Sequence, residues 1–240
     1  MWSATDKIRL RQAERYLTAA KVLAWPAFLL ILAALYMAFI YAPRERQMGE
    51  VQRIFYFHIG AAWNALGVCF LAVFIAGILY LWKKRRIWDH VGASFVEIGL
   101  AYTTINLTTG MFWARPVWNT WWPWGDPRVT LMLVLWLIYV AYMIFRSTMP
   151  DGEKKYKYCA VFGIIGFLDV PLVYVSIHIW RTIHPKVITS EGMALETPMI
   201  MALFTSMAAF TALTALLFCL RMAMRLQRTV VLERLYEETV

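Results

Sequence analysis

Two groups of residues in this 240-residue sequence could bind a ligand: a tryptophan-rich segment and two histidines that flank it. Residues 113–128 hold five tryptophans, three prolines, two arginines and one aspartate. Because proline lacks an N–H and clashes with the preceding turn, we expect a rigid, irregular loop here. Its indole rings could form a flat surface for a large planar ligand. The alternative is an ordinary belt of tryptophans at a membrane interface.

The candidate ligand-binding side chains of this segment are Trp113, Trp118, Trp121, Trp122, Trp124, Asp126 and Arg128. The arginine could pair with a carboxylate of the ligand. Asp126 could instead hold Arg128, or position the loop by accepting backbone N–H groups.

Four histidines narrow the chemistry. His58 and His184 each lie at the end of an apolar run, on the same expected side as the tryptophans. Two imidazoles that converge beside aromatic rings can supply both axial ligands of a haem iron, so both are candidate metal ligands. The alternative is that each is a hydrogen-bonded surface residue. His178 is six residues before His184 and falls on another helix face, and we expect His90 to be a loop residue or a helix cap.

The elements that must position these residues are membrane spans. Hydrophobic residues make up 61% of the chain, compared with about 45–50% in soluble domains. Runs of about 20 apolar residues are long enough to cross a bilayer. Six such runs occur, at about 22–42, 54–82, 91–112, 129–145, 158–180 and 197–220. The sequence therefore predicts an all-α integral membrane protein with six transmembrane helices.

A single six-helix membrane domain over residues 1–240 is expected, and charge predicts its orientation. Seventeen of the 24 basic residues fall in four segments that the six spans place on one side, namely residues 1–21, 83–90, 146–157 and 221–234. The positive-inside rule puts this side and both termini in the cytoplasm. The outer loops are then about 43–53, 113–128 and 181–196. The tryptophan-rich loop faces outward, between the third and fourth helices.

The sequence lacks the motifs typical of several other classes of protein. The net charge of +9 is explained by anionic lipid of the bilayer, and no nucleic-acid partner is expected. No phosphate-binding loop, nucleophile elbow or helical metal-ligand pair occurs, so ATP hydrolysis and other catalysis by this chain are not indicated. Cys69, Cys159 and Cys219 are single and predict buried thiols. Glu97 and Asp169 fall inside spans, where an acid is a candidate for function.

The segment Trp118-Asn-Thr-Trp121-Trp122-Pro-Trp124-Gly-Asp126 resembles the W-G-x-x-W-x-W-D signature of the membrane haem-handling proteins of cytochrome c maturation. The chain is most similar to the haem exporter protein C family in length, six spans and a histidine in each flanking outer loop. Two departures occur: Asn119 stands where the family has glycine, and Gly125 is inserted before Asp126.

The resemblance implies that His58 and His184 are axial ligands of a non-covalently bound haem b. It implies a protein of the bacterial inner membrane that delivers haem to a periplasmic haem chaperone. The further partners implied are the ATPase and membrane subunits of an ABC transporter and a small membrane subunit. No catalytic role of the chain itself is implied.

Two alternative functions are considered. A membrane b-type cytochrome in quinol-linked electron transfer would carry its axial histidines on paired helices at bilayer depth. A plain permease subunit would use the tryptophans only as anchors. The placement of both candidate histidines at span ends on one side favours haem binding at the outer face.

Overall fold

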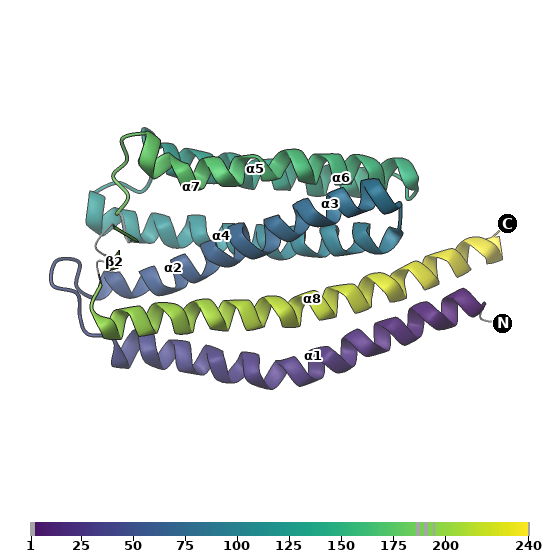
Figure 1. Cartoon of the computed structure of the whole chain (residues 1–240), viewed down its shortest axis with the longest axis horizontal. Helices are drawn as coiled ribbons and strands as arrows, with labels where there is room; N and C mark the ends of the chain where they lie inside the picture. The colour runs from purple at the N-terminus through teal and green to yellow at the C-terminus, as the bar shows by residue number, and fades with distance from the viewer. Residues whose placement is uncertain (1–2, 186–187, 190–191, 194, 240) are drawn as a thin grey trace.

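The computed structural model describes residues 3–185, 188–189, 192–193 and 195–239, which form a bundle of long helices (Figure 1). The helices are α1 (Ala4–Tyr36), α2 (Arg53–Trp63), α3 (Leu71–Lys83), α4 (Arg86–Trp118), α5 (Pro127–Thr148), α6 (Glu153–Phe167), α7 (Asp169–Ile179) and α8 (Thr197–Thr239). Short helical turns join or extend them, namely the π-helical η1 (Met37–Tyr41) and η3 (Asn64–Phe70) and the 3₁₀ turn η2 (Glu50–Gln52). A small antiparallel hairpin of β1 (Ile188–Thr189) and β2 (Gly192–Met193) adds to the expected all-α fold.

The connections between helices gather at two opposite ends of the bundle. The α1–α2, α4–α5 and α7–α8 connections lie at one end, which we call the loop end (Figure 1). Both termini and the α3–α4 and α5–α6 connections lie at the other, which we call the terminal end. The three predicted outer loops therefore come together at one end of the molecule.

Five helical segments are long and apolar enough to cross a bilayer, whereas the sequence predicts six spans. These segments are Ala4–Tyr41, Glu50–Lys83, Pro127–Thr148, Glu153–Ile179 and Thr197–Leu235. The remaining predicted span, 91–112, lies within α4. This helix has 33 residues, or about 50 Å, so its length suffices. Its composition is the difference, because it carries Glu97, Asn106 and several threonines.

The polar side chains of α4 are accommodated because neighbouring helices surround them. Val96, Ile98 and Tyr102 of α4 belong to a core cluster with residues of α3, α5 and α7. Ser94 and Thr103 are buried and donate to backbone carbonyls one turn earlier in the helix. A helix surrounded by protein needs less apolar surface than one that faces lipid on most sides.

Glu97 has a structural role in the described part of the chain. Its carboxylate pairs with Arg221 and Arg225 of α8, the latter at 2.7 Å. Charged groups inside a bundle are stable only when they are paired in this way. The other acid inside a predicted span, Asp169, is buried, and its Oδ2 has no hydrogen-bond partner among the described residues.

Alanines at every seventh position hold α1 against α8. Ala13, Ala20, Ala27 and Ala34 are each at most 3% exposed, and α8 is the main neighbour of α1 (Figure 1). A seven-residue spacing keeps one helix face against a partner, and alanine lets the two backbones approach closely. We call this row the alanine seam.

The tryptophan-rich segment is more helical than predicted, and the reason lies in its prolines. α4 continues through Trp113 to Trp118 with Pro116 in its last turn, where only one helical hydrogen bond is lost. Pro127 occupies the first position of α5, which suits its fixed φ and missing N–H. The expected irregular loop over 113–128 is therefore wrong at both ends, and only residues 119–126 are irregular.

The other two outer loops also differ from their predicted bounds. Within 43–53, η2 is already helical and Arg53 begins α2. Arg53 donates to the carbonyls of Ala38, within η1, and Ala42, just after it, so it connects α2 to the end of the first span. Within 181–196, β1 and β2 form the hairpin, and residues 186–187, 190–191 and 194 lie outside the described residues.

Asn119 ends α4 in the left-handed region, with φ of 53°. This conformation favours glycine and is tolerated by asparagine. The same position holds glycine in the signature that this segment resembles, so the departure at Asn119 preserves the backbone requirement.

We predict that Asn119→Gly leaves the midpoint of thermal unfolding in detergent close to that of the unmodified protein. Asn119→Val should destabilise the protein by about 1–2 kcal/mol, because a β-branched residue resists a positive φ. Arg115→Ala is the control, since Arg115 bonds both the carbonyl and the side chain of Asn119. Equal losses in Asn119→Val and Arg115→Ala would assign the effect to the lost hydrogen bonds and contradict the backbone argument.

Candidate functional site

The predicted ligand-binding residues lie at the loop end of the bundle and come from four segments. His58 is on α2, Trp113 and Trp118 are on the last turns of α4, and Trp121, Trp122 and Trp124 follow in residues 119–126. Asp126 and Arg128 begin α5, and His184 follows α7. The structure therefore brings together residues that the sequence separates by more than 120 positions.

The carboxylate of Asp126 organises this end of the molecule. It caps α5 by accepting the backbone N–H groups of Arg128 and Val129, at 3.0 and 3.2 Å. It also accepts the hydroxyl of Thr182 at 2.5 Å and the N–H of Ile183 at 3.0 Å. His184 Nδ1 lies 3.1 Å from its Oδ1. Asp126 is only 5% exposed, so it connects the segment after α7 to the start of α5 from a protected position.

The expectation that Asp126 positions the loop fits these contacts better than the alternative that it holds Arg128. Among the described residues, no carboxylate lies within ion-pair distance of the partly buried Arg128 guanidinium. The protein itself supplies five donors to Asp126. This residue is therefore placed to orient His184 and the loop.

Electrostatics keep His184 neutral and Asp126 charged. Burial lowers the pKa of His184, and this effect outweighs the opposing charge of Asp126. Burial alone would raise the pKa of Asp126, but the hydrogen bond from Thr182 and the proximity of His184 hold it below its ordinary value. A neutral imidazole whose Nδ1–H donates to a carboxylate has its lone pair on Nε2. His184 therefore has the form that binds a metal ion through Nε2.

His58 is held against α4 on both sides of its ring. Its Nδ1 lies 3.1 Å from Thr109 Oγ1, and its Nε2 lies 3.1 Å from Asn106 Nδ2. An added Cβ at Gly110 would lie 3.2 Å from the His58 Cε1, so glycine gives the imidazole room. His58 on α2 and His184 after α7 both lie at the loop end of the bundle, although they come from opposite halves of the chain.

The tryptophans of this region do not form one flat surface. Trp118 meets the His184 ring edge-on at 5.1 Å, and Trp113 meets Trp118 at 4.9 Å with ring planes 89° apart. Trp122 and Trp124 are tilted by 56° at 5.8 Å. Trp121 packs edge-on against Phe112. The expected flat platform is therefore wrong: the rings meet in separate pairs at large angles, and Trp118 connects one of these pairs to His184.

Two indole N–H groups in this region lack partners. The Nε1 atoms of Trp113 and Trp122 are buried and make no hydrogen bond within the described chain. Buried donors without acceptors are rare in folded proteins. Together with Arg128, which has no carboxylate partner among the described residues, they are donors at this end that a ligand with acceptor atoms could satisfy.

The remaining histidines lie elsewhere. His178 on α7 contacts only the ring of Tyr174 among the ring contacts of the described residues. His90 was expected to be a loop residue or a helix cap, but it is neither: it is buried within α4 near Thr229 of α8. The physical reason is that α4 begins at Arg86 and packs on the long final helix there. The three cysteines are buried and free, and no group of three or more metal-binding side chains occurs in the described residues.

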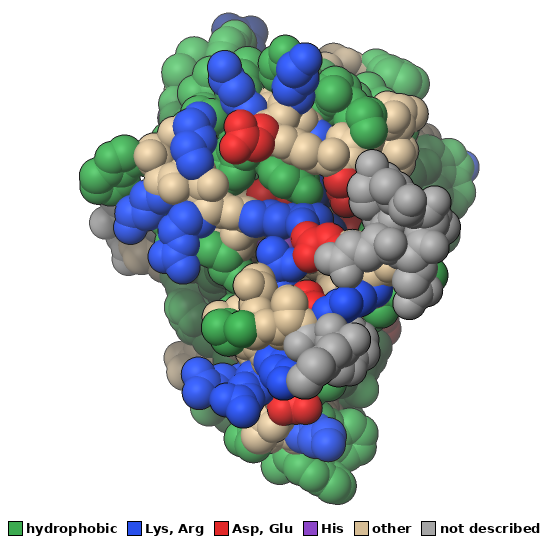
Figure 2. Space-filling model, turned by 90° about the vertical axis from the view of Figure 1, so that its right-hand side faces the viewer, with side chains coloured by type: hydrophobic (Ala, Val, Ile, Leu, Met, Phe, Trp, Pro, Cys, Tyr) green, Lys and Arg blue, Asp and Glu red, His purple; other side chains and the backbone are tan. Residues whose placement is uncertain are grey.

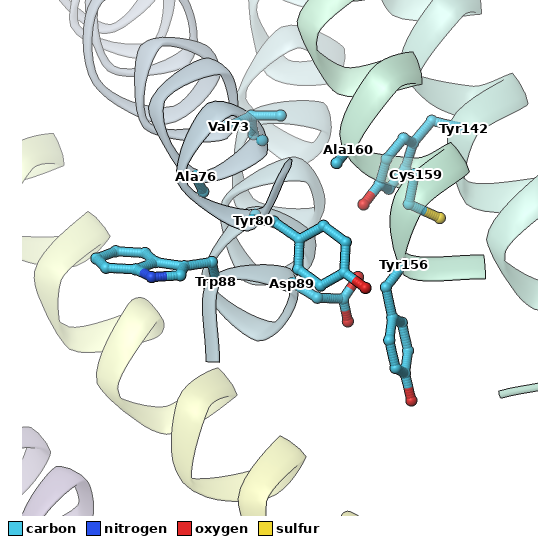
Figure 3. A pocket seen from close by; sticks show the side chains of 11 residues that line it. Val73, Ala76, Tyr80, Trp88, Asp89, Tyr142, Tyr156, Cys159 and Ala160 are labelled. Carbon is cyan, nitrogen blue, oxygen red and sulfur yellow. The ribbon is translucent and has the colours of Figure 1, made fainter. Parts of the chain in front are cut away.

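A small cavity lies at the terminal end, away from these residues. Its internal volume is about 10 Å³, far below the roughly 300–1,000 Å³ of typical small-molecule sites. Tyr80, Trp88, Asp89, Tyr142, Tyr156 and Cys159 are among its lining side chains (Figure 3). Asp89 is already paired with Arg146, both of its oxygens bound at 2.6–2.7 Å. This cavity is therefore not a candidate for binding a planar macrocycle.

Sequence reasoning missed three residues that hold the histidines: Asn106, Thr109 and Thr182. Asn106 could have been found, because an asparagine inside an apolar run needs a partner. Thr109 is one of several threonines on the same helix, and Thr182 reaches Asp126 across 56 residues. Neither has a sequence signal that separates it from its neighbours.

Comparison with known proteins agrees with this arrangement. The family model described as Heme exporter protein C matches residues 4–237. A ccmC-like mitochondrial protein of cytochrome c biosynthesis from Marchantia polymorpha is 32% identical over 84% of this chain and 85% of its own length. Heme exporter protein C from Escherichia coli K12 is 29% identical over 77% of this chain and 74% of its own. The corresponding protein of Bradyrhizobium diazoefficiens is also 29% identical, over 86% and 80%. With nearly its whole length matched, and with the histidines and tryptophans gathered at one end of a membrane bundle, this chain belongs to the Heme exporter protein C family.

Proposed function

We propose that this protein binds haem at the outer face of the bacterial inner membrane and delivers it to a periplasmic haem chaperone during c-type cytochrome biogenesis. The names of its relatives support a role in haem handling. The observation that carries the proposal is the state of His184. Its Nδ1 lies 3.1 Å from Asp126 Oδ1, and no side chain of the described residues hydrogen-bonds its Nε2.

The residues at the loop end fit a haem as cargo. His58 and His184 would supply the two axial nitrogens to the iron of a non-covalently bound haem b. The indoles of Trp113, Trp118, Trp121, Trp122 and Trp124 would contact the apolar macrocycle. Arg128 would pair with a propionate, because no carboxylate of the described chain neutralises it.

Asp126 would act through His184 instead of touching haem. A carboxylate that accepts the Nδ1–H of a ligating histidine fixes the ring orientation and strengthens the ligand. The same carboxylate fixes the start of α5, and therefore the place of Arg128. This assignment replaces the expectation that Asp126 is itself a haem contact.

The proposed orientation places the terminal end in the cytoplasm and makes α4 a sixth span. Figure 2 shows Lys and Arg side chains spread over the terminal end. This is the distribution that the positive-inside rule predicts for a cytoplasmic face. The loop end would then face the periplasm, where the chaperone would collect the haem.

The proposed partners also include the ATPase and membrane subunits of an ABC transporter and a small membrane subunit. The sequence contains no phosphate-binding loop, so any ATP hydrolysis must come from another chain. The bundle offers apolar helix faces that such membrane subunits or lipid could cover, including Trp25, Phe28 and Leu32 on α1. A b-type cytochrome is less well supported, because its axial histidines would face each other at bilayer depth and not at one end.

The orientation can be tested with reporters active only in the periplasm. We predict activity for a fusion after Gly125 and none for a fusion after Lys84, because α4 would cross the bilayer between them. Equal activity at both positions would show that α4 does not cross. Activity only after Lys84 would reverse the protein in the membrane and remove the proposed delivery to the periplasm.

Haem ligation can be tested by spectroscopy of the purified protein. We expect six-coordinate, low-spin haem that shifts toward high-spin in His58→Ala or His184→Ala, because each change removes one axial bond. Asp126→Asn should weaken haem affinity by roughly 10–100-fold while leaving His184 in place. The control is His178→Ala, which should resemble the unmodified protein. An unchanged spectrum in His184→Ala would reject the ligand assignment.

The tryptophans should contribute unequally to haem retention. Trp118→Ala should lower affinity by roughly twofold to tenfold, because it removes an aromatic contact beside His184. Trp121→Ala should have a smaller effect, since Trp121 packs on Phe112. Trp25→Ala on the exposed face of α1 is the matched control. Haem content per purified protein and cytochrome c maturation in the same cells are the measurements. Full haem and maturation after replacing Trp118, Trp121, Trp122 and Trp124 together would make these residues an interfacial belt only.

A further inference from the structure

The two candidate iron ligands are held differently at Nε2, the atom that would bind iron. His184 Nδ1 lies 3.1 Å from Asp126 Oδ1, and no side chain of the described residues hydrogen-bonds its Nε2. His58 has a partner on each nitrogen, Thr109 at Nδ1 and Asn106 at Nε2. Iron could therefore bind His184 directly, whereas binding His58 requires a change at Asn106.

The contacts of Asn106 fix which way its amide points. Its Nδ2 lies 3.2 Å from the backbone carbonyl of His58 as well as 3.1 Å from the His58 Nε2. A carbonyl oxygen can only accept, so the NH₂ group and not the amide oxygen must face His58. Both amide hydrogens are then donated to the same residue. The His58 Nε2 must accept, which puts the ring proton on Nδ1, facing Thr109.

Asn106 therefore prepares His58 and also covers it. It selects the tautomer with the lone pair on Nε2, which is the form that binds iron. The Asn106 amide also donates a hydrogen bond to the lone pair of the His58 Nε2. This contact is buried, because Asn106 is only 4% exposed. An asparagine inside a predicted span needs hydrogen-bond partners, and here both N–H groups of the side-chain amide donate to His58.

We propose that Asn106 is a displaceable cap on His58, which makes His58 the second ligand to bind haem iron and the first to release it. This inference rests on the proposed function. When iron is bound at His58, the Asn106 amide loses its bond to Nε2 but keeps its bond to the His58 carbonyl. When the His58–iron bond opens, the amide takes the lone pair again and opposes rebinding. Asn106 is thus a positioning residue that favours haem transfer over retention.

The test compares Asn106→Leu with Thr109→Val in purified full-length protein titrated with ferric haem. Leucine is close to asparagine in size and has no donor, so the cap is removed. We expect a larger low-spin fraction and haem transfer to apomyoglobin slowed by roughly twofold to tenfold, the range for one net hydrogen bond. Thr109→Val removes the acceptor of the Nδ1–H and should change both quantities in the opposite direction.

The opposite signs separate the proposed cap from a merely structural role. If Asn106 only supports folding, Asn106→Leu should lose low-spin haem as Thr109→Val does, and that result overturns the proposal. Asn106→Ala is the second variant, which also removes the amide and should also slow haem transfer. Faster haem transfer in Asn106→Ala than in the unmodified protein would contradict a cap. For each variant, the helical content and the midpoint of thermal unfolding are first compared with those of the unmodified protein, to show that the variant is folded.

A double-mutant comparison shows whether the effect passes through His58. In a His58→Ala background, Asn106→Leu should no longer slow haem transfer, because no Nε2 remains to be capped. In a His184→Ala background the slowing should persist. A full effect in the His58→Ala background would overturn the cap while leaving haem binding itself intact. Loss of all haem-dependent spectra in the unmodified protein would instead reject the proposed function.

Discussion

The carboxylate of Asp126 joins two segments that lie 56 to 58 residues apart, and the arrangement of the loop end depends on that junction. On one side it caps α5, and on the other it holds the turn that carries His184. Five donors converge on two oxygens in a position with little water. Without the carboxylate, each donor that stayed buried would be left unsatisfied, at about 1–3 kcal/mol apiece. One short side chain therefore sets the place of a helix, a loop and an imidazole at once.

α4 extends this junction into the membrane bundle. Its last turns carry Trp113 and Trp118, and Trp118 contacts His184. Further along the same helix, toward its middle, Asn106 and Thr109 hold His58. Near the terminal end, Glu97 binds two arginines of α8. Every polar group named here would be unfavourable on a lipid-facing helix, so the central position of α4 is what allows it to carry the polar contacts of the site.

Much of this arrangement could be predicted from the sequence, because apolar run length and charge asymmetry are local signals. They predicted the helical membrane class, and they predicted that His58 and His184 lie near the ends of helical segments at one end of the bundle. The helical state of Trp113 and Trp118 was missed, because the effect of Pro116 depends on how near it lies to the helix end. Burial of His90 and pairing of Glu97 depend on α8, more than 100 residues away, and no local pattern reports such contacts.

The alanine seam has a consequence for how the protein is made. α1 leaves the ribosome well before α8, the helix that it packs against. At about 5–20 residues per second, roughly 10–30 s of translation separate the two. During that interval α1 must remain in the bilayer with its small-residue face turned toward lipid. α2 also packs against α8 and must wait for it. Gly60 of α2 lies so close to Phe210 of α8 that an added Cβ would be 2.8 Å from the phenylalanine ring. The helix that carries His58 therefore gains this neighbour only after α8 has been made, so the surroundings of His58 are completed late in the assembly of the bundle.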